Sequence, residues 1–107
     1  MIKIEDFARV DLRVGRVLKA ERIEKSQKLL ELLVDLGEIG QRTIVAGLAA
    51  HYPPENLVNK FIVVVANLEP ALLRGVRSEG MLLAAVKDEQ LALLTLDRAI
   101  EPGSKIC

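Results

Sequence analysis

The segment Phe61-Ile62-Val63-Val64-Val65-Ala66 decides the fold, because it is an uninterrupted apolar run rich in β-branched side chains. Such a run is typical of a strand buried on both faces, which places it at the centre of the core. A connection from Asn67 to Gly80 follows it. Two further apolar runs, Met81–Val86 and Leu91–Leu96, then flank a polar turn. These two runs predict a hairpin.

The residues before the central run predict a long first strand. Apolar and charged residues alternate from Asp11 to Glu21, and the alternation breaks at Gly15–Val17. A glycine inside such a pattern commonly marks a bulge or a sharp bend. A helical alternative remains open, because the basic residues at every third position from Arg13 to Lys28 could share one helix face, most simply a solvated one.

Two more strands and a short helix are expected between these segments. The alternating residues Leu30–Leu36 and the segment Gln41–Ala46 predict strands that are joined by a glycine-containing turn. By propensity alone, Leu29–Leu33 could also be helical. Pro53-Pro54-Glu55 favours a short helix or helical turn before the central run.

Three strands, a short helix and further strands predict an all-β fold of the OB type, a five-stranded Greek-key barrel with a helix between the third and fourth strands. The length of 107 residues suits a single domain spanning residues 1–107. Residues 97–107 lie outside a minimal barrel and form a C-terminal extension. We expect this extension to pair across the interface of a homodimer.

Composition excludes several classes of protein. Fifteen basic and fifteen acidic residues give a net charge of zero, which argues against the basic field of a non-specific nucleic-acid binder. Any contact with nucleic acid therefore needs a local patch, and residues 1–28 carry eight basic but only five acidic side chains. Apolar stretches fall short of the roughly 18 residues of a membrane helix, and the N-terminus does not resemble a secretory signal. We therefore expect a cytoplasmic protein without a membrane partner.

Catalytic and metal-binding patterns are missing from the sequence. His51 is the only histidine and Cys107 the only cysteine, so the usual zinc ligand sets cannot form. No GxSxG, GxGxxG or Walker motif is present. The sequence therefore predicts no catalytic residues, no metal and no cofactor.

The string from Val65 to Ala85, which contains Asn67-Leu68-Glu69-Pro70 and Arg74-Gly75-Val76-Arg77-Ser78-Glu79-Gly80-Met81, resembles the signature of the structure-specific tRNA-binding domain family. Further matching segments occur in the family's order, so that the resemblance covers nearly the whole chain: Glu5-Asp6-Phe7, Asp11–Gly15, Lys28-Leu29, Thr43–Leu48 and Pro54–Val58. The family includes free-standing tRNA-binding dimers and the C-terminal domain or beta subunit of methionyl-tRNA synthetase. It also includes chaperone-like proteins associated with secretion.

The resemblance implies an OB barrel that binds the outer corner of folded tRNA by shape, as a homodimer in its small free-standing forms. Carried over by position, it implies five RNA-binding residues and two glycines that shape the loop between them: Lys28, Asn67, Arg74, Ser78 and Met81, with Gly75 and Gly80. Basic side chains would meet phosphates, polar ones sugar or phosphate oxygens, and the methionine a base or ribose.

Purely structural roles remain open for three of these residues. Asn67 could be a turn residue that bonds nearby backbone, Ser78 could cap or turn the chain, and Met81 could belong to the core. The turn Ile23–Leu29 departs from the pattern His-Pro-Asn-Ala-Asp-Lys-Leu of many members, because only Lys28-Leu29 is shared. That departure favours the free-standing branch. A second hypothesis is a dimeric, chaperone-like protein that binds peptides through the apolar residues 71–73.

Overall fold

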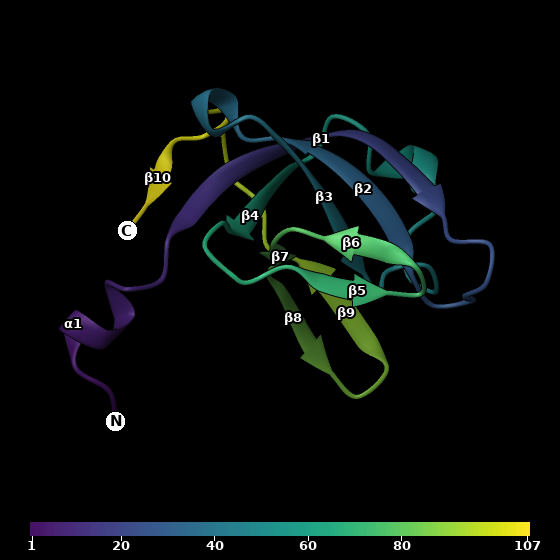
Figure 1. Cartoon of the computed structure of the whole chain (residues 1–107), viewed down its shortest axis with the longest axis horizontal. Coiled ribbons are helices and arrows are strands. Elements are labelled where there is room, and N and C mark those ends of the chain that lie inside the picture. Colours follow the sequence, from purple (N-terminus) through teal and green to yellow (C-terminus); the bar gives the residue numbers. More distant parts are fainter.

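The computed structural model describes all 107 residues, and its largest sheet is wound into a nearly closed barrel (Figure 1). The strands of this barrel are neighbours in the order β3-β2-β1-β4-β7, and every pair is antiparallel. Three elements are helical and ten are strands: α1 (Ile4–Phe7), β1 (Leu12–Arg22), β2 (Leu30–Asp35), η1 (Gly37–Ile39), β3 (Gln41–Ala46), η2 (Pro54–Asn56), β4 (Phe61–Val65), β5 (Ala71–Leu73), β6 (Val76–Ser78), β7 (Met81–Leu82), β8 (Ala84–Lys87), β9 (Gln90–Leu93) and β10 (Lys105–Ile106). This arrangement confirms the expected five-stranded barrel.

Strand β1 is the long, bent strand that the sequence predicts. Its first half pairs with β4 and its second half with β2. The register shifts between Val17 and Lys19, slightly later than the break in the sequence pattern. Gly15 has a different role, because a Cβ atom there would lie only 2.6 Å from Val34 Cγ1. The missing side chain lets β1 pass close over the core.

Strand β2 supplies the clearest alternation in the core. Leu30, Leu32 and Val34 are fully buried, and the residues between them are half-buried. This period of two excludes the helical alternative for this segment. The largest apolar cluster draws on all five barrel strands and the η2 region: Val17, Leu30, Leu32, Val34, Leu36, Ile44, Leu48, Leu57, Ile62, Val64 and Leu82.

Strand β4 is buried on both faces, as the apolar run predicts. The short helix before it is confirmed as the single turn η2. Leu57, immediately after η2, is fully buried and packs in the main cluster. This turn therefore covers one end of the barrel.

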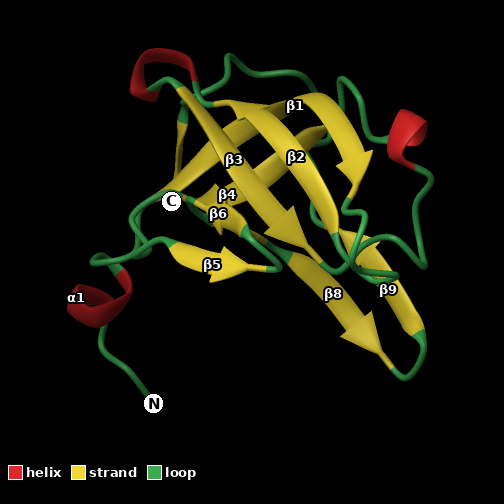
Figure 2. Cartoon of the chain, turned by 45° about the vertical axis from the view of Figure 1, so that its right-hand side comes forward, coloured by secondary structure: helices red, strands yellow, loops and turns green.

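The expectation of a plain connection between residues 67 and 80 was incomplete. This segment contains the hairpin β5–β6, which lies beside β3. The predicted hairpin at residues 81–96 is confirmed in β8 and β9, although its first strand is divided into β7 and β8 and its second ends at Leu93. Figure 2 shows both hairpins outside the main barrel sheet.

The C-terminal extension pairs with its own chain. Lys105 and Ile106 align with the start of β1. Gly103 N donates to Val14 O at 2.7 Å, and Val14 N donates to Ser104 O at 2.9 Å. Strand β2 pairs with β1 only from Arg16 onward, so the first residues of β1 have an edge that the extension occupies. Within the chain the extension thus completes the edge of β1, and its contact with a second copy stays a prediction.

Helix α1 was not expected from the sequence. It has only four residues and none of them is buried. Figure 1 shows it apart from the barrel, on the same side as β10. Nowhere does the chain form a helix with the length and apolar character that a membrane crossing requires.

Candidate nucleic-acid interface

The β5–β6 hairpin presents Arg74 at its tip. Leu73 pairs with Val76, so Arg74 and Gly75 form a two-residue turn. Their φ angles are +50° and +82°, the pair of left-handed conformations that a type I′ turn requires. A Cβ atom at Gly75 would have open space around it, so the backbone angle is what favours glycine there. The turn exposes the Arg74 side chain to solvent.

Arg74 is the unpaired cation of this hairpin. The other arginine, Arg77, lies with its Nε 3.8 Å from Glu79 Oε2. Arg74 has no such carboxylate partner. An exposed guanidinium without an internal partner keeps all its donors available for an anion such as a phosphate.

Ser78 anchors the hairpin to β3. Its side chain is buried, with an exposed fraction of 4% for the residue. The hydroxyl accepts from Val45 N at 3.0 Å and donates to Gly80 O at 3.2 Å. Next to it, Glu79 N donates to Thr43 O at 2.7 Å. Both hydrogen bonds of the Ser78 hydroxyl are thus made within the protein. An RNA contact would need this hydroxyl on the surface, where it does not lie.

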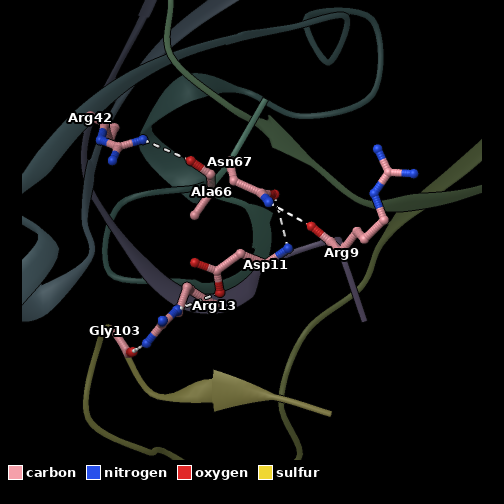
Figure 3. Close-up of polar contacts among 7 residues, drawn as sticks. All are labelled: Arg9, Asp11, Arg13, Arg42, Ala66, Asn67 and Gly103. Carbon is pink, nitrogen blue, oxygen red and sulfur yellow. Dashed lines mark hydrogen bonds and ion pairs between the residues drawn. The ribbon is translucent and has the colours of Figure 1, made fainter. Parts of the chain in front are cut away.

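Asn67 holds the N-terminal segment against the end of β4 (Figure 3). Its Oδ1 accepts from Asp11 N at 2.9 Å, and its Nδ2 donates to Arg9 O at 2.7 Å. Asn67 does bond backbone groups, but not the nearby backbone that the interpretation as a turn residue expects. The backbone it bonds belongs to the start of the chain and not to its own turn.

Met81 and Lys28 are on the surface. Met81 pairs with Val65 in the barrel sheet, but 47% of it is exposed, so it is not a core residue. Lys28 is exposed in the connection between β1 and β2, where Ala49 N donates to its carbonyl oxygen at 3.1 Å. Neither side chain has an ion-pair or hydrogen-bond partner within the protein.

The expected site residues do not form one cluster. Strand β6 approaches β3 in antiparallel sense, so the hairpin tip points towards Ala46, which pairs with Leu30 just after Lys28. Arg74 and Lys28 thus belong to one end of the barrel. Asn67 contacts Asp11 at the other end of β1.

The outer face of β1, β2 and β3 is poorly suited to RNA. A depression of about 140 Å³ on it is lined by Lys19, Glu21, Glu31, Leu33 and Thr43. Lys19 Nζ lies 2.8 Å from Glu21 Oε1, and this hydrogen bond and the charge of Glu21 raise the pKa of Lys19 above its ordinary value. Its ammonium group is therefore already committed to a carboxylate.

Aromatic stacking platforms are also missing from this outer face. The chain has three aromatic residues, Phe7, Tyr52 and Phe61. Phe7 lies in α1, Tyr52 packs against the core and accepts a hydrogen bond from Leu93 N at 3.1 Å, and Phe61 is half-buried in β4. Single-stranded RNA is typically bound by stacking its bases on such rings. The outer face of β1 to β3 therefore carries no aromatic ring on which a base could stack.

Sequence reasoning missed Arg42. Its Nη1 donates to Ala66 O at 3.0 Å and to Glu79 O at 3.3 Å. The only signal was a basic residue within an otherwise regular strand, and neither acceptor is close to it in sequence. No cluster of three or more potential metal-ligating side chains is found in the structure.

Comparison with known proteins identifies the family of this chain. Residues 12–105 match the model of the family described as "Putative tRNA binding domain". The chain belongs to this tRNA-binding domain family. The matched family is a tRNA-binding domain and not a catalytic one.

Several relatives of this tRNA-binding domain are much longer proteins. It is 53% identical over 106 residues to a methionine–tRNA ligase of Archaeoglobus fulgidus, covering 99% of this chain. It is 57% identical over 105 residues to the corresponding enzyme of Thermotoga maritima, covering 98%. The chain spans only 16% of the length of each ligase. It is thus homologous to one region of methionyl-tRNA synthetases.

Solved structures of similar size also share the fold of this tRNA-binding domain. A protein related to methionyl-tRNA synthetase from Pyrococcus horikoshii superposes with a TM-score of 0.94 at 35% identity, over 100% of this chain and 98% of that one. The chaperone CsaA of Bacillus anthracis gives a TM-score of 0.92 at 33% identity, over 100% and 99%.

Proposed function

We propose that this domain binds folded tRNA without catalysing a reaction, and that the β5–β6 hairpin makes the central contact. The observation that carries this proposal is the exposed, unpaired Arg74 on a turn of defined geometry. A guanidinium at the tip of a turn with defined backbone angles can meet phosphate oxygens of a folded RNA, and the backbone that carries it needs little further ordering.

A net charge of zero is compatible with this function. The salt-dependent part of RNA affinity depends on the phosphates contacted locally and not on the charge of the whole protein. Lys28, at the same end of the barrel as Arg74, adds a second unpaired cation. Met81 adds an exposed, flexible apolar surface at the other end of the loop.

The methionine–tRNA ligase relatives suggest where this contact is used. We infer that the domain assists a methionyl-tRNA synthetase, either as a part of it or as a separate subunit, by adding an RNA contact that is independent of the anticodon. A free-standing dimeric form is the other arrangement that the family resemblance allows. A tRNA ligand in either arrangement would place the protein in the cytoplasm.

Homodimer formation is supported by the N-terminal segment. Ile2 and Ile4 are 72% and 74% exposed, and Phe7 is 43% exposed. The hydrogen bonds of Asn67 hold this segment beside the barrel without burying these side chains. We infer that a second copy of the chain covers them, since exposed apolar side chains grouped on a short helix and just before it gain most by being buried.

A binding titration tests the tRNA proposal. Wild-type protein should bind total tRNA more tightly than unstructured RNA of similar length, and more weakly at the higher of two salt concentrations. Arg74→Glu should weaken binding strongly, and Arg74→Asn, which removes the charge but tolerates the left-handed backbone, should raise the Kd by roughly tenfold.

Arg98→Gln is the matched control for the loss of charge. Arg98 is 81% exposed and its Nε lies 3.7 Å from Asp97 Oδ1, so its loss should leave the Kd unchanged. Equal affinity of wild-type protein for tRNA and unstructured RNA would overturn the tRNA proposal. Unchanged affinity of Arg74→Glu would overturn the assignment of the hairpin.

A chaperone-like function is the second candidate. Leu72 is 73% exposed on β5 and Leu68 is 45% exposed before it, and the overall fold matches CsaA along its full length. Such a surface could hold an apolar peptide. Suppression of the aggregation of an unfolded client by wild-type protein, and its loss in Leu72→Ser, would favour this function. Tight, salt-sensitive tRNA binding without such suppression would exclude it.

A further inference from the structure

The loop that carries Arg74 begins and ends at two backbone carbonyl groups bound by one side chain. This loop, residues 67–78, is called the hairpin loop below. Ala66 precedes it and Glu79 follows it. Arg42 Nη1 lies 3.0 Å from Ala66 O and 3.3 Å from Glu79 O. Figure 3 shows the guanidinium of Arg42 directed at Ala66 O. The two hydrogens of Nη1 suffice for both bonds, so one nitrogen bridges the two ends of the loop.

No other group of the protein donates to these two carbonyl oxygens. No backbone N–H donates to Ala66 O or to Glu79 O. No carboxylate oxygen forms an ion pair with Arg42. The half-buried guanidinium is therefore committed to the base of the hairpin loop and not to a neighbouring acid.

Packing does little to hold the hairpin loop. Strand β5 has no buried residue, and in β6 only Ser78 is buried. The bonds of Ser78 and Glu79 attach the end of the loop to β3. Arg42 alone joins β3 to the start of the loop as well as to its end. The pairing of Met81 with Val65 keeps the two ends close together, so the loss of Arg42 should loosen the loop against β3 without separating its ends.

We propose that Arg42 is a positioning residue for tRNA binding. By bridging the two ends of the hairpin loop it holds Arg74 where it meets the RNA, and Arg42 itself does not contact RNA. A loop ordered before binding loses less conformational entropy when the complex forms. This inference rests on the proposed function, since it names the residue that prepares the same site.

The first test compares tRNA affinities. Arg42→Gln, which removes the charge and shortens the side chain, should raise the Kd by roughly tenfold. Arg42→Lys, which keeps cationic donors, should stay within about threefold of wild type. In a protein that already carries Arg74→Asn, Arg42→Gln should change the Kd by less than about threefold, because the contact that it positions is gone. Arg98→Gln should match wild type.

The second test follows the loop without RNA. Backbone amide hydrogen exchange at residues 71–78 should be faster in Arg42→Gln than in wild type, while the amides of β1 and β2 exchange as before. Urea denaturation establishes that each variant is folded, and Arg42→Met, which keeps the length of the side chain but lacks its donors, replaces Arg42→Gln if the latter is not. The proposal is overturned by unchanged loop exchange, or by an equal Kd change with and without Arg74.

These outcomes separate the two proposals. Failure of wild-type protein to prefer tRNA would overturn the proposed function and, with it, this role of Arg42. Normal tRNA binding by wild type, weakened by Arg74→Asn but not by Arg42→Gln, would overturn the role of Arg42 alone.

Discussion

Ser78 and Ser26 make the same kind of hydrogen bond in different surroundings. Ser78 Oγ accepts from Val45 N inside the protein, whereas Ser26 Oγ accepts from Lys28 N and Leu29 N in a half-exposed loop. Ser78→Ala should lower the free energy of unfolding by about 1–3 kcal/mol, because Val45 N is left buried without an acceptor. Ser26→Ala should cost less than about 1 kcal/mol, since water can replace its hydroxyl. Urea denaturation compares the two, and equal losses would contradict the structural role of Ser78.

The role of an individual site residue could be predicted from the sequence only where the residue type allows few roles. Arg74 is exposed and unpaired, as an RNA contact must be, while the hydroxyl of Ser78 and the amide of Asn67 are used inside the chain. A serine or an asparagine suits either use, and the sequence does not show which is buried. Arg42 could not be found at all, because its acceptors lie 24 and 37 residues away.

The C-terminal extension depends on Gly103, which lets two backbone segments meet. A Cβ atom at Gly103 would lie 2.4 Å from Leu36 O, and Gly103 has a φ of +90°. Gly103→Ala should therefore lower the free energy of unfolding by about 2–4 kcal/mol, through strain and the displacement of the extension from β1. Gly47→Ala is the control: a Cβ atom at Gly47 would meet nothing within 4 Å, so the free energy of unfolding should change by less than about 0.5 kcal/mol.

Thermal or urea unfolding monitored by circular dichroism checks this prediction. Hydrogen exchange of Val14 N, which donates to Ser104 O, reports directly on the extension. If Gly103→Ala were as stable as wild type and protected Val14 equally, the extension would not be held by this contact.

Elements were predictable where burial produced a pattern. Strands β2 and β4 alternate or run apolar because the core covers one or both of their faces. Strands β5 and β6 have three residues each and almost no buried side chain, so no period reveals them. Their turn is Arg-Gly and lacks the asparagine or aspartate that usually marks a type I′ hairpin.

The charge of the whole molecule acts through its distribution. The outer face of β1 to β3 pairs Lys19 with Glu21, while Arg74 and Lys28 remain unpaired at one end of the barrel. A folded RNA would therefore approach the hairpin end, and each phosphate contact should add about 0.7–0.9 to the slope of log affinity against log salt. The Kd of Arg74→Asn should show a correspondingly smaller salt dependence than that of wild type.

The proposed dimer formation through α1 is a property of the whole molecule, and it can be tested by substitutions in that helix. Ile4→Ser combined with Phe7→Ser should shift the protein towards the monomer, because α1 offers these side chains to a partner and not to its own core. A buried apolar side chain contributes about 1.5–3 kcal/mol, and a two-fold axis uses each residue twice. The dissociation constant of the dimer should therefore rise by far more than tenfold. Sedimentation velocity over a concentration series measures this shift.

The barrel itself should not be weakened by that double substitution, since no residue of α1 is buried. Val86→Ser is the matched control: Val86 is 67% exposed on the β8–β9 hairpin, and its replacement should leave the dimer intact. With one subunit lost, only one hairpin can contact each RNA, so tRNA affinity should fall even though Arg74 is untouched. A wild-type protein that sediments as a monomer, or a double variant that dimerises as tightly as wild type, would show that α1 does not join two copies.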